Sequence, residues 1–317
     1  MSKFVWKKGL SLTLAAVLMV GGLAACGKKE EDTKNAASPS ASSSVKPSTS
    51  TAPSASPSTS PSKAPEVTGK VTASGSTALQ PLVQKAAGDF MAKNPKADIQ
   101  VTGGGSGKGV TDVATGASDI GNSDVEADAQ YKSQLVDHIV VLAPFALIVN
   151  KGVGVDNLTK QQAADIFMGK ITNWKDVGGK DAKITVVHRP ESSGSRKLVK
   201  QIVLSNQEFT KDGVQQDTSK AVAEAVGSTD NSIGYVDVPY IKQYADKIKA
   251  LKLDGTEYSS ENIKSGKYLL FGQEHMYTKG EATGATKAFL DYIMSAEFLN
   301  KPEVVDLGFL PADLLKK

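Results

Sequence analysis

A long segment of low sequence complexity confines folding to the later part of this 317-residue chain. From Ala36 to Pro65 the residues are almost entirely Ser, Pro, Thr and Ala, which bring little apolar surface to bury. Such a segment cannot offset the conformational entropy that ordering it would cost. We therefore expect residues 26–66 to form a disordered tether, with a reach on the order of 100 Å at roughly 3 Å per residue. The globular body should run from about Val67 to Lys317.

The first residues have the pattern of an export signal that ends in a lipid-attachment site. Three lysines precede a largely apolar run at residues 10–23, which is shorter than a membrane span and typical of a signal peptide. The run closes with Leu-Ala-Ala-Cys, which resembles the cleavage box of bacterial lipoproteins. We expect removal of residues 1–25 and acylation of Cys26, palmitate included, which would anchor the protein to the extracytoplasmic face of the cell membrane. The alternative is an ordinary signal peptide with an incidental cysteine.

Alternating strands and helices in the body indicate an α/β fold whose sheets are covered on both faces. Runs of β-branched residues predict strands, and apolar residues at helical spacing predict helices. The strands are expected at residues 70–74, 98–102, 139–149, 183–187 and 233–236. The helices are expected at residues 79–91, 108–115, 161–168, 195–204 and 283–294.

Charge and motif content argue against several classes of function. The net charge is +3, and three lysines near the N-terminus account for it, so the body is close to neutral. Nucleic-acid binding needs a concentrated basic face and is not expected. His138, His188 and His275 have no metal-ligand spacing, and we expect no metal or other cofactor. A P-loop and a nucleophile elbow both fail at Lys108, where the flanking residues are wrong or a glycine is missing.

Four short polar segments share one pattern, a strand followed by a turn rich in Gly, Ser and Thr that usually opens a helix. They are residues 75–78, 103–107, 118–124 and 189–195. Helix N-termini offer unpaired N–H groups and a partial positive charge, and glycines let an anion approach the backbone. Arg189 is the cation within these turns. Together they predict an oxyanion site, whereas each turn alone could be ordinary helix capping.

These four segments, in this order and spacing, resemble those of the phosphate-binding proteins of bacterial ABC-type phosphate importers. The similarity covers the body and includes Gly234-Tyr235 and the late segment Glu-His-Met-Tyr-Thr-Lys-Gly at residues 274–280. The resemblance implies an α/β, two-lobe, periplasmic-binding-protein fold (type II) with a hinge and phosphate in the interlobe cleft. Lobe one would comprise residues 67–145 and 262–317, and lobe two residues 146–261.

The resemblance also implies which residues of this chain contact the ligand. The expected phosphate-binding residues are Thr77, Ala78 (through its amide), Ser106, Asp124, Arg189, Ser193, Gly194 and Ser195. Ser76 and Glu191 are expected as supporting residues. Glu191 stands where members of the family often have an Asp that orients the arginine. Arg196, just after the turn, is expected to be a solvated surface residue.

Asp124 would give the site its selectivity. An ionised carboxylate only accepts hydrogen bonds. It would therefore repel fully ionised sulfate but accept the proton of a hydrogen phosphate ion. The alternative is that Asp124 serves as a helix N-cap.

The sequence thus predicts a monomeric, lipid-anchored protein that captures inorganic phosphate outside the cytoplasmic membrane and delivers it to the membrane subunits of an ABC-type importer. One alternative is a phosphate sensor or surface adhesin on the same fold. A second is a phosphoester hydrolase with Ser76 or Ser106 as nucleophile, although no base can be identified for either serine.

Overall fold

The computed structural model describes residues 66–315, which form a mixed α/β structure. The expected signal peptide, Cys26 and nearly all of the expected tether lie outside the described residues. The strands are β1 (Gly69–Gly75), β2 (Ala97–Gly104), β3 (Ile120–Ser123), β4 (Leu135–Asn150), β5 (Asn157–Leu158), β6 (Thr185–His188), β7 (Val214–Gln215), β8 (Ser232–Asp237), β9 (Ile248–Ala250), β10 (Lys252–Leu253), β11 (Phe271–Lys279) and β12 (Leu310–Pro311).

The helices fill the connections between these strands. They are α1 (Gln80–Lys93), α2 (Ser106–Thr115), α3 (Ala129–Lys132), α4 (Lys160–Phe167), α5 (Gly194–Ile202), α6 (Ser219–Ser228), α7 (Val238–Gln243), α8 (Ser260–Lys264), α9 (Gly284–Ile293), α10 (Ala296–Leu299) and α11 (Pro302–Val305), with a 3-10 turn at Trp174–Val177. Among these helices of residues 66–315, none combines the length and apolar composition that a bilayer span requires.

Most strands join one sheet in the order β2-β1-β3-β11-β4-β8-β6-β7, and β9 and β12 also pair with β4. The strands β1, β2 and β3 are parallel, whereas β11 runs antiparallel to both β3 and β4. Parallel strands place their carboxyl ends at one edge of a sheet. The polar turns that follow β1, β2 and β3 therefore lie together.

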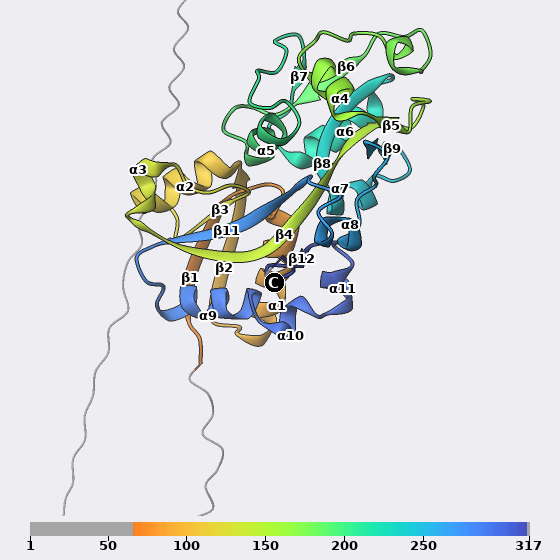
Figure 1. Ribbon diagram of the computed structural model, residues 1–317. Helices are drawn as coiled ribbons and strands as arrows, with labels where there is room; N and C mark the ends of the chain where they lie inside the picture. The colour runs from red at the N-terminus through yellow and green to blue at the C-terminus, as the bar shows by residue number, and fades with distance from the viewer. Residues whose placement is uncertain (1–65, 316–317) are drawn as a thin grey trace, which may run out of the picture. The chain divides into compact units, whose positions relative to one another are not determined.

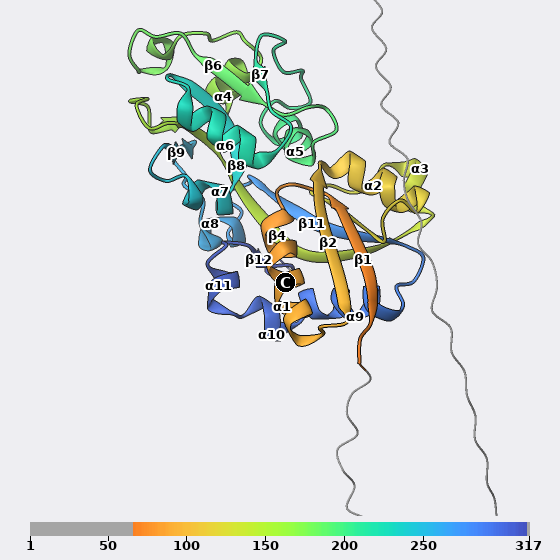
Figure 2. The ribbon, with the colours of Figure 1, turned by 180° about the vertical axis from the view of Figure 1, so that it is seen from behind.

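The first lobe is built on β1, β2, β3 and β11, with α1 and α9 packed against the sheet (Figures 1 and 2). Helix α1 buries the face that its spacing predicts, including Leu82, Val83 and Phe90. Its proline lies at the first helical positions, where a missing N–H costs nothing. Phe90 packs edge-on against Phe289 of α9, with ring centroids 5.6 Å apart, which joins the two helices in one apolar core.

The second lobe has its own apolar core around β6, β8, α4 and α5. Trp174, Phe167 and Tyr235 are fully buried there. Helix α4 begins with a complete capping box, in which Thr159 and Gln162 satisfy each other's backbone N–H groups. A further apolar cluster packs α6 and α7 against β4 and β8.

Strand β4 belongs to both lobes (Figure 1). Its first part pairs with β11, and from Phe145 onward it pairs with β8. The segment by which the chain returns from the second lobe to the first lies beside β4. The Phe145 N–H donates to the Leu270 carbonyl at 3.0 Å, and the Tyr268 hydroxyl donates to the Phe145 carbonyl at 2.9 Å. Ile263, Tyr268 and Leu270 pack in the core of the second lobe. On packing, the chain therefore returns to the first lobe at β11, later than the boundary expected near residue 262.

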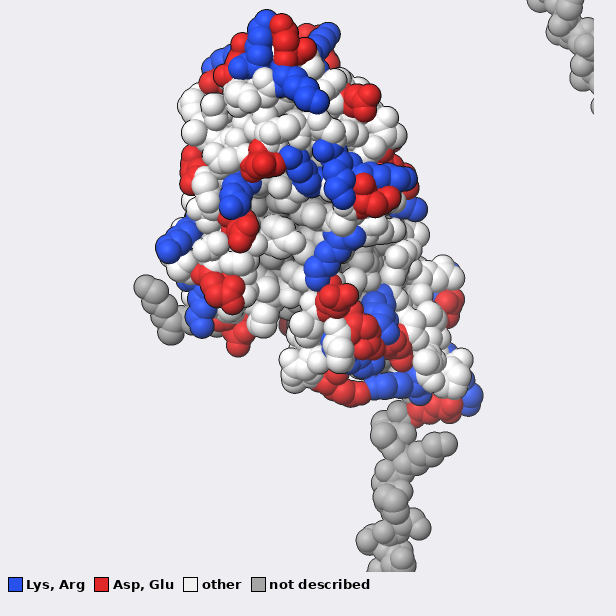
Figure 3. All heavy atoms as spheres, turned by 90° about the vertical axis from the view of Figure 1, so that its right-hand side faces the viewer, with Lys and Arg blue, Asp and Glu red and all other residues white. Residues whose placement is uncertain are grey.

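Each of the ten elements predicted from sequence overlaps a strand or helix of the structure. The patterns missed three elements that bear on the site, β3, α6 and β11, and also the short elements α3, α7, α8, α10, α11, β5, β7, β9, β10 and β12. Strand β3 is only four residues long, and β11 carries Glu274 and His275 on a strand that is buried almost throughout. Charges of both signs are intermixed over the face of the body shown in Figure 3, as expected for a nearly neutral body.

Candidate anion-binding site

The four predicted polar turns converge and are joined by direct hydrogen bonds. The Ser76 N–H donates to the Asn122 carbonyl at 2.9 Å, which links the first turn to the third. The Gly105 N–H donates to the Gly75 carbonyl at 2.8 Å, which links the second turn to the first. The fourth turn belongs to the other lobe, and the Gly107 N–H donates to its Ser192 carbonyl at 2.9 Å. The lobes are therefore in contact at the predicted site.

Asp124 lies at the centre of this group and is only 4% exposed. Its Oδ2 accepts a hydrogen bond from the Ser195 hydroxyl at 2.8 Å, and its backbone N–H donates to Ser106 Oγ at 3.0 Å. Its Oδ1 has no hydrogen-bond partner among residues 66–315. A buried acceptor of this kind requires a donor, which a protonated ligand could supply. Gly194 lies against this group, and any side chain there would collide with Ser106 Oγ and Asp124 Oδ2.

Arg189 is the buried cation of the site, at 2% exposure. Its Nη1 donates to Ser219 Oγ at 3.1 Å and its Nη2 donates to the Asp217 carbonyl at 2.9 Å. Its Nε has no partner, and the guanidinium forms no salt bridge within the part of the chain that the structure describes. A buried charge without a counter-ion is costly, so this guanidinium favours binding of an anion.

The first turn reaches across to the second lobe through Thr77. Its Oγ1 lies 3.1 Å from Ser219 Oγ and accepts a hydrogen bond from the Ser219 N–H, also at 3.1 Å. The Tyr240 hydroxyl donates to the Thr77 carbonyl at 2.8 Å. Ser76 stabilises the turn, because its Oγ accepts hydrogen bonds from the N–H groups of Ala78 at 3.1 Å and Leu79 at 3.0 Å. The Ala78 N–H, expected to face the ligand, is thus engaged by Ser76.

Two site residues were missed at the level of sequence, Ser219 and Asp237. Ser219 opens α6, whose N-cap Thr218 accepts from the Ala221 N–H. The sequence does contain a signal for the start of this helix, because Thr218-Ser219 precedes small and apolar residues with helical spacing. Asp237 is 3% exposed, with Oδ2 3.5 Å from Ser219 Oγ. Burial, followed by the nearby charge of Asp124, raises the pKa of Asp237 to about 8, and Arg189 opposes this rise.

The structure corrects the expected roles of Glu191 and Arg196. Glu191 is exposed and forms no ion pair with Arg189, so it does not orient that side chain. Glu191 follows Pro190 in the turn, and its side chain lies on the surface. Arg196 is only 9% exposed and stacks on Phe209, with its guanidinium carbon 4.2 Å from the ring centroid.

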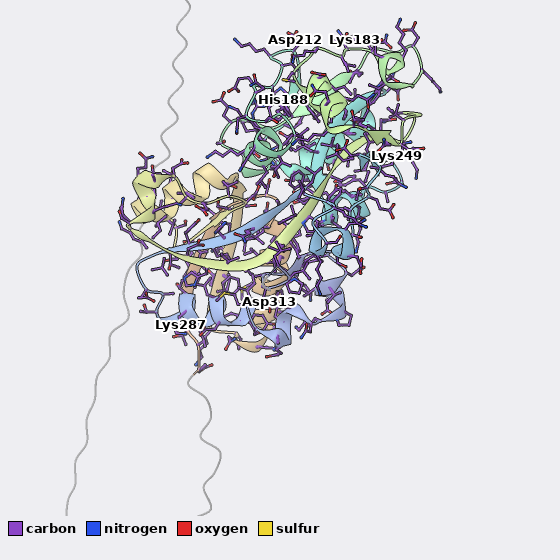
Figure 4. The ribbon with its side chains drawn as sticks, viewed as in Figure 1. Lys183, His188, Asp212, Lys249, Lys287 and Asp313 are labelled. Atoms are coloured by element: carbon purple, nitrogen blue, oxygen red, sulfur yellow. The ribbon has the colours of Figure 1, made fainter. Side chains whose placement is uncertain are left out.

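Arg196 also fixes the strand end that carries Arg189. Its Nη1 donates to His188 Nδ1 and to the Arg189 carbonyl, both at 2.9 Å. His188 is buried in the second lobe (Figure 4), and this burial lowers its pKa, so the ring is held neutral and accepts from Arg196. His188 is therefore a structural residue at the end of β6. Ser193 is likewise structural in part, since its Oγ caps α5 by accepting from the Arg196 N–H at 3.3 Å.

Comparison with known proteins identifies the family. The family model described as a PBP superfamily domain matches residues 48–297. The phosphate-binding protein PstS of Bacillus subtilis (strain 168) is 41% identical over 310 residues, covering 97% of this chain and 94% of that protein. The chain belongs to the PstS family of phosphate-binding proteins.

Solved structures agree with this PstS assignment. A crystal structure from Clostridium perfringens with bound phosphate is 32% identical and has a TM-score of 0.72, covering 77% of this chain and 99% of that one. An ABC-type phosphate transport receptor from Vibrio cholerae shares the fold with a TM-score of 0.61 at 24% identity, covering 76% of this chain and 99% of that one. The predicted α/β, two-lobe periplasmic-binding-protein fold is confirmed.

Proposed function

We propose that this PstS-family chain binds inorganic phosphate between its two lobes and delivers it to an ABC-type phosphate importer. One pair of groups carries the proposal. Arg189 offers a buried, unpaired N–H on a cation, and Asp124 offers a buried, unpaired acceptor oxygen. A ligand that satisfies both must be an anion that still carries a proton, and hydrogen phosphate has both properties.

The remaining groups suit a tetrahedral oxyanion. We propose that Thr77, Ser106, Ser193 and Ser195 supply hydroxyls, that the amide of Gly194 faces the ligand, and that Arg189 supplies the charge. The Ala78 N–H would join them only if its bond to Ser76 Oγ opened. Because these groups come from both lobes, bound phosphate would stabilise the state in which the lobes are in contact. Opening would occur at the two crossings, near Phe145 and Leu270, where the lobes meet.

A binding role without catalysis is part of this proposal. Ser76 Oγ and Ser106 Oγ both accept hydrogen bonds from backbone amides. Neither hydroxyl contacts a histidine or carboxylate side chain among residues 66–315 that could serve as its base. We also propose that the mature chain starts at Cys26, carries lipid there as a monomer, and stands on the expected tether outside the cytoplasmic membrane.

Calorimetry tests the function directly. The chain lacking residues 1–26 would be titrated with phosphate, sulfate and molybdate in parallel, and incubated with a chromogenic phosphoester. We expect tight binding of phosphate, much weaker binding of the proton-free anions, and no hydrolysis. Equal affinity for sulfate would refute the proposed selectivity, and turnover of the phosphoester would favour the hydrolase.

A further inference from the structure

Glu274 is a buried carboxyl group that the proposed phosphate contacts do not use. It lies in β11 at 1% exposure, and neither of its carboxylate oxygens has a hydrogen-bond partner among residues 66–315. No cation pairs with it in that part of the chain. An ionised carboxylate in such surroundings is far more costly than a neutral one.

Asp124 of the site lies beside Glu274, because the antiparallel register of β11 with β3 pairs His275 with Ser123. A side chain added at Gly272, two residues earlier on β11, would lie 3.1 Å from the Asp124 carbonyl oxygen and 3.8 Å from Glu274 Oε1. The Asp124 backbone carbonyl and Glu274 Oε1 therefore both border the position of this glycine. The charges of Asp124 and Asp237 both act on Glu274, in addition to its burial, and all three effects raise its pKa well above the ordinary range.

The other elements packed against Glu274 bring no compensating charge. On β4 its partner in register is Val141, and α5 presents Leu198 beside Gly272. The neighbouring His275 is engaged elsewhere, because its Nδ1 lies 2.9 Å from an oxygen of Asp137. The site's cation, Arg189, acts on Asp237 and bonds to the second lobe.

The charge balance of the site therefore requires protons. Asp124, Asp237 and Glu274, if all ionised, would repel one another before any anion arrived, and of the three only Asp237 has Arg189 acting to offset its charge. An added phosphate ion would increase the repulsion further. The site can bind an anion only if some of these carboxyl groups are neutral when the lobes are together.

We propose that Glu274 is a third carboxyl group of the anion site, protonated when the lobes close on phosphate and ionised when the cleft opens to water. On closure one proton passes from solvent to a Glu274 oxygen, and on opening it returns to solvent. Phosphate release would thereby be coupled to loss of a proton. This inference rests on the proposed phosphate-binding function.

The sign of the pH dependence follows from this linkage. Because the closed state holds the proton more tightly than the open state, affinity is full below the pKa of Glu274 in the open protein. It falls as pH rises from that value to the pKa in the closed complex, by about tenfold per pH unit.

The experiment compares dissociation constants of phosphate for wild type and Glu274→Gln, from about pH 4 to about pH 9. Gln mimics the neutral acid and cannot titrate. The titration of phosphate itself is the same for both proteins and cancels in the ratio. We expect the ratio of wild-type to variant dissociation constants to be near one below the pKa of Glu274 in the open protein and to rise by about tenfold per pH unit above it. The exposed Glu281, just after the same strand, provides the control Glu281→Gln, which should follow wild type.

If both proteins bind phosphate but the ratio of their dissociation constants does not change with pH, the inference is wrong and the proposed function stands. Failure of wild type to bind phosphate would overturn both. A spectroscopic measurement needs no variant, in case Glu274→Gln does not fold. Among residues 66–315, Glu274 is the only buried glutamate, and the other two buried acids, Asp124 and Asp237, are aspartates. In protein labelled with ¹³C at glutamate carboxyl groups, phosphate should produce the infrared C=O band of a protonated glutamate, and absence of this band would refute the proposal.

Discussion

The Ser195 hydroxyl donates to Asp124 Oδ2 at 2.8 Å, and the two residues belong to different lobes. This hydrogen bond occupies one carboxylate oxygen, and Oδ1 has no partner among residues 66–315. Under the proposed function, the same residue would both contact the opposite lobe and select the anion.

We expect Asp124→Asn to keep phosphate binding and lose much of the discrimination against sulfate. The amide can donate as well as accept, so a proton-free anion no longer meets an obligatory acceptor. Discrimination should shrink by about 1–3 kcal/mol. The measurement is the ratio of sulfate to phosphate dissociation constants in wild type and variant. If Asp124 were only an N-cap, Asn would leave that ratio unchanged.

Arg189→Lys should weaken phosphate binding by about tenfold or more, because one charged hydrogen bond is worth about 1.5–3 kcal/mol. A lysine retains the charge but cannot keep the contacts to Ser219 and the Asp217 carbonyl while also reaching the ligand. Titration calorimetry measures the loss. Lys197→Arg on the exposed side of α5 is the control and should bind as wild type does.

Arg196→Lys should act on stability more than on the ligand. The substitution removes the stacking on Phe209 and the two bonds to His188 and the Arg189 carbonyl. We expect the free energy of unfolding in urea to fall by about 1–3 kcal/mol. Its phosphate affinity should fall less than that of Arg189→Lys. Equal losses of affinity would mean that Arg196 contacts the anion itself.

Asp237→Asn should remove a pH dependence of stability. Since the pKa of Asp237 is raised to about 8 in the folded protein, its contribution is fully present below the unfolded-state pKa and is lost as pH rises toward 8. The variant should therefore gain in melting temperature relative to wild type between acid and mildly alkaline pH. Asp246→Asn, at an exposed acid, should show no such trend. Parallel curves for Asp237→Asn and wild type would show that Asp237 is ionised throughout.

Cys26→Ser should shift the protein from the membrane fraction to unlipidated precursor or secreted protein, without changing phosphate affinity. Fractionation and gel mobility measure the change. Unaltered membrane association and mobility would refute lipid attachment at this residue. Limited proteolysis of wild type should cut between residues 36 and 65 and leave a body starting near Glu66.

Local sequence patterns were sufficient for most of the elements that carry the four turns. Three of the turns follow a strand or open a helix that the sequence patterns predict, whereas the third contains β3, which those patterns missed. Asp237 and Glu274 could not be found in this way. Their positions depend on register, Asp237 opposite Phe145 and Glu274 opposite Val141 on β4, and no short pattern specifies such long-range pairing. The burial of Arg196 was missed for a similar reason, because it depends on Phe209 in a separate loop.

Strand β4 changes partners next to Pro144, a residue without an amide hydrogen. The first lobe holds this strand up to that proline and the second lobe holds it from Phe145 onward. Rotation of one lobe against the other would therefore be concentrated in a few backbone torsions there and in the adjacent return segment. A hinge of this kind allows mainly one rotation of the second lobe relative to the first. Opening and closing would then change mainly one angle between the lobes, while each lobe moved as a unit.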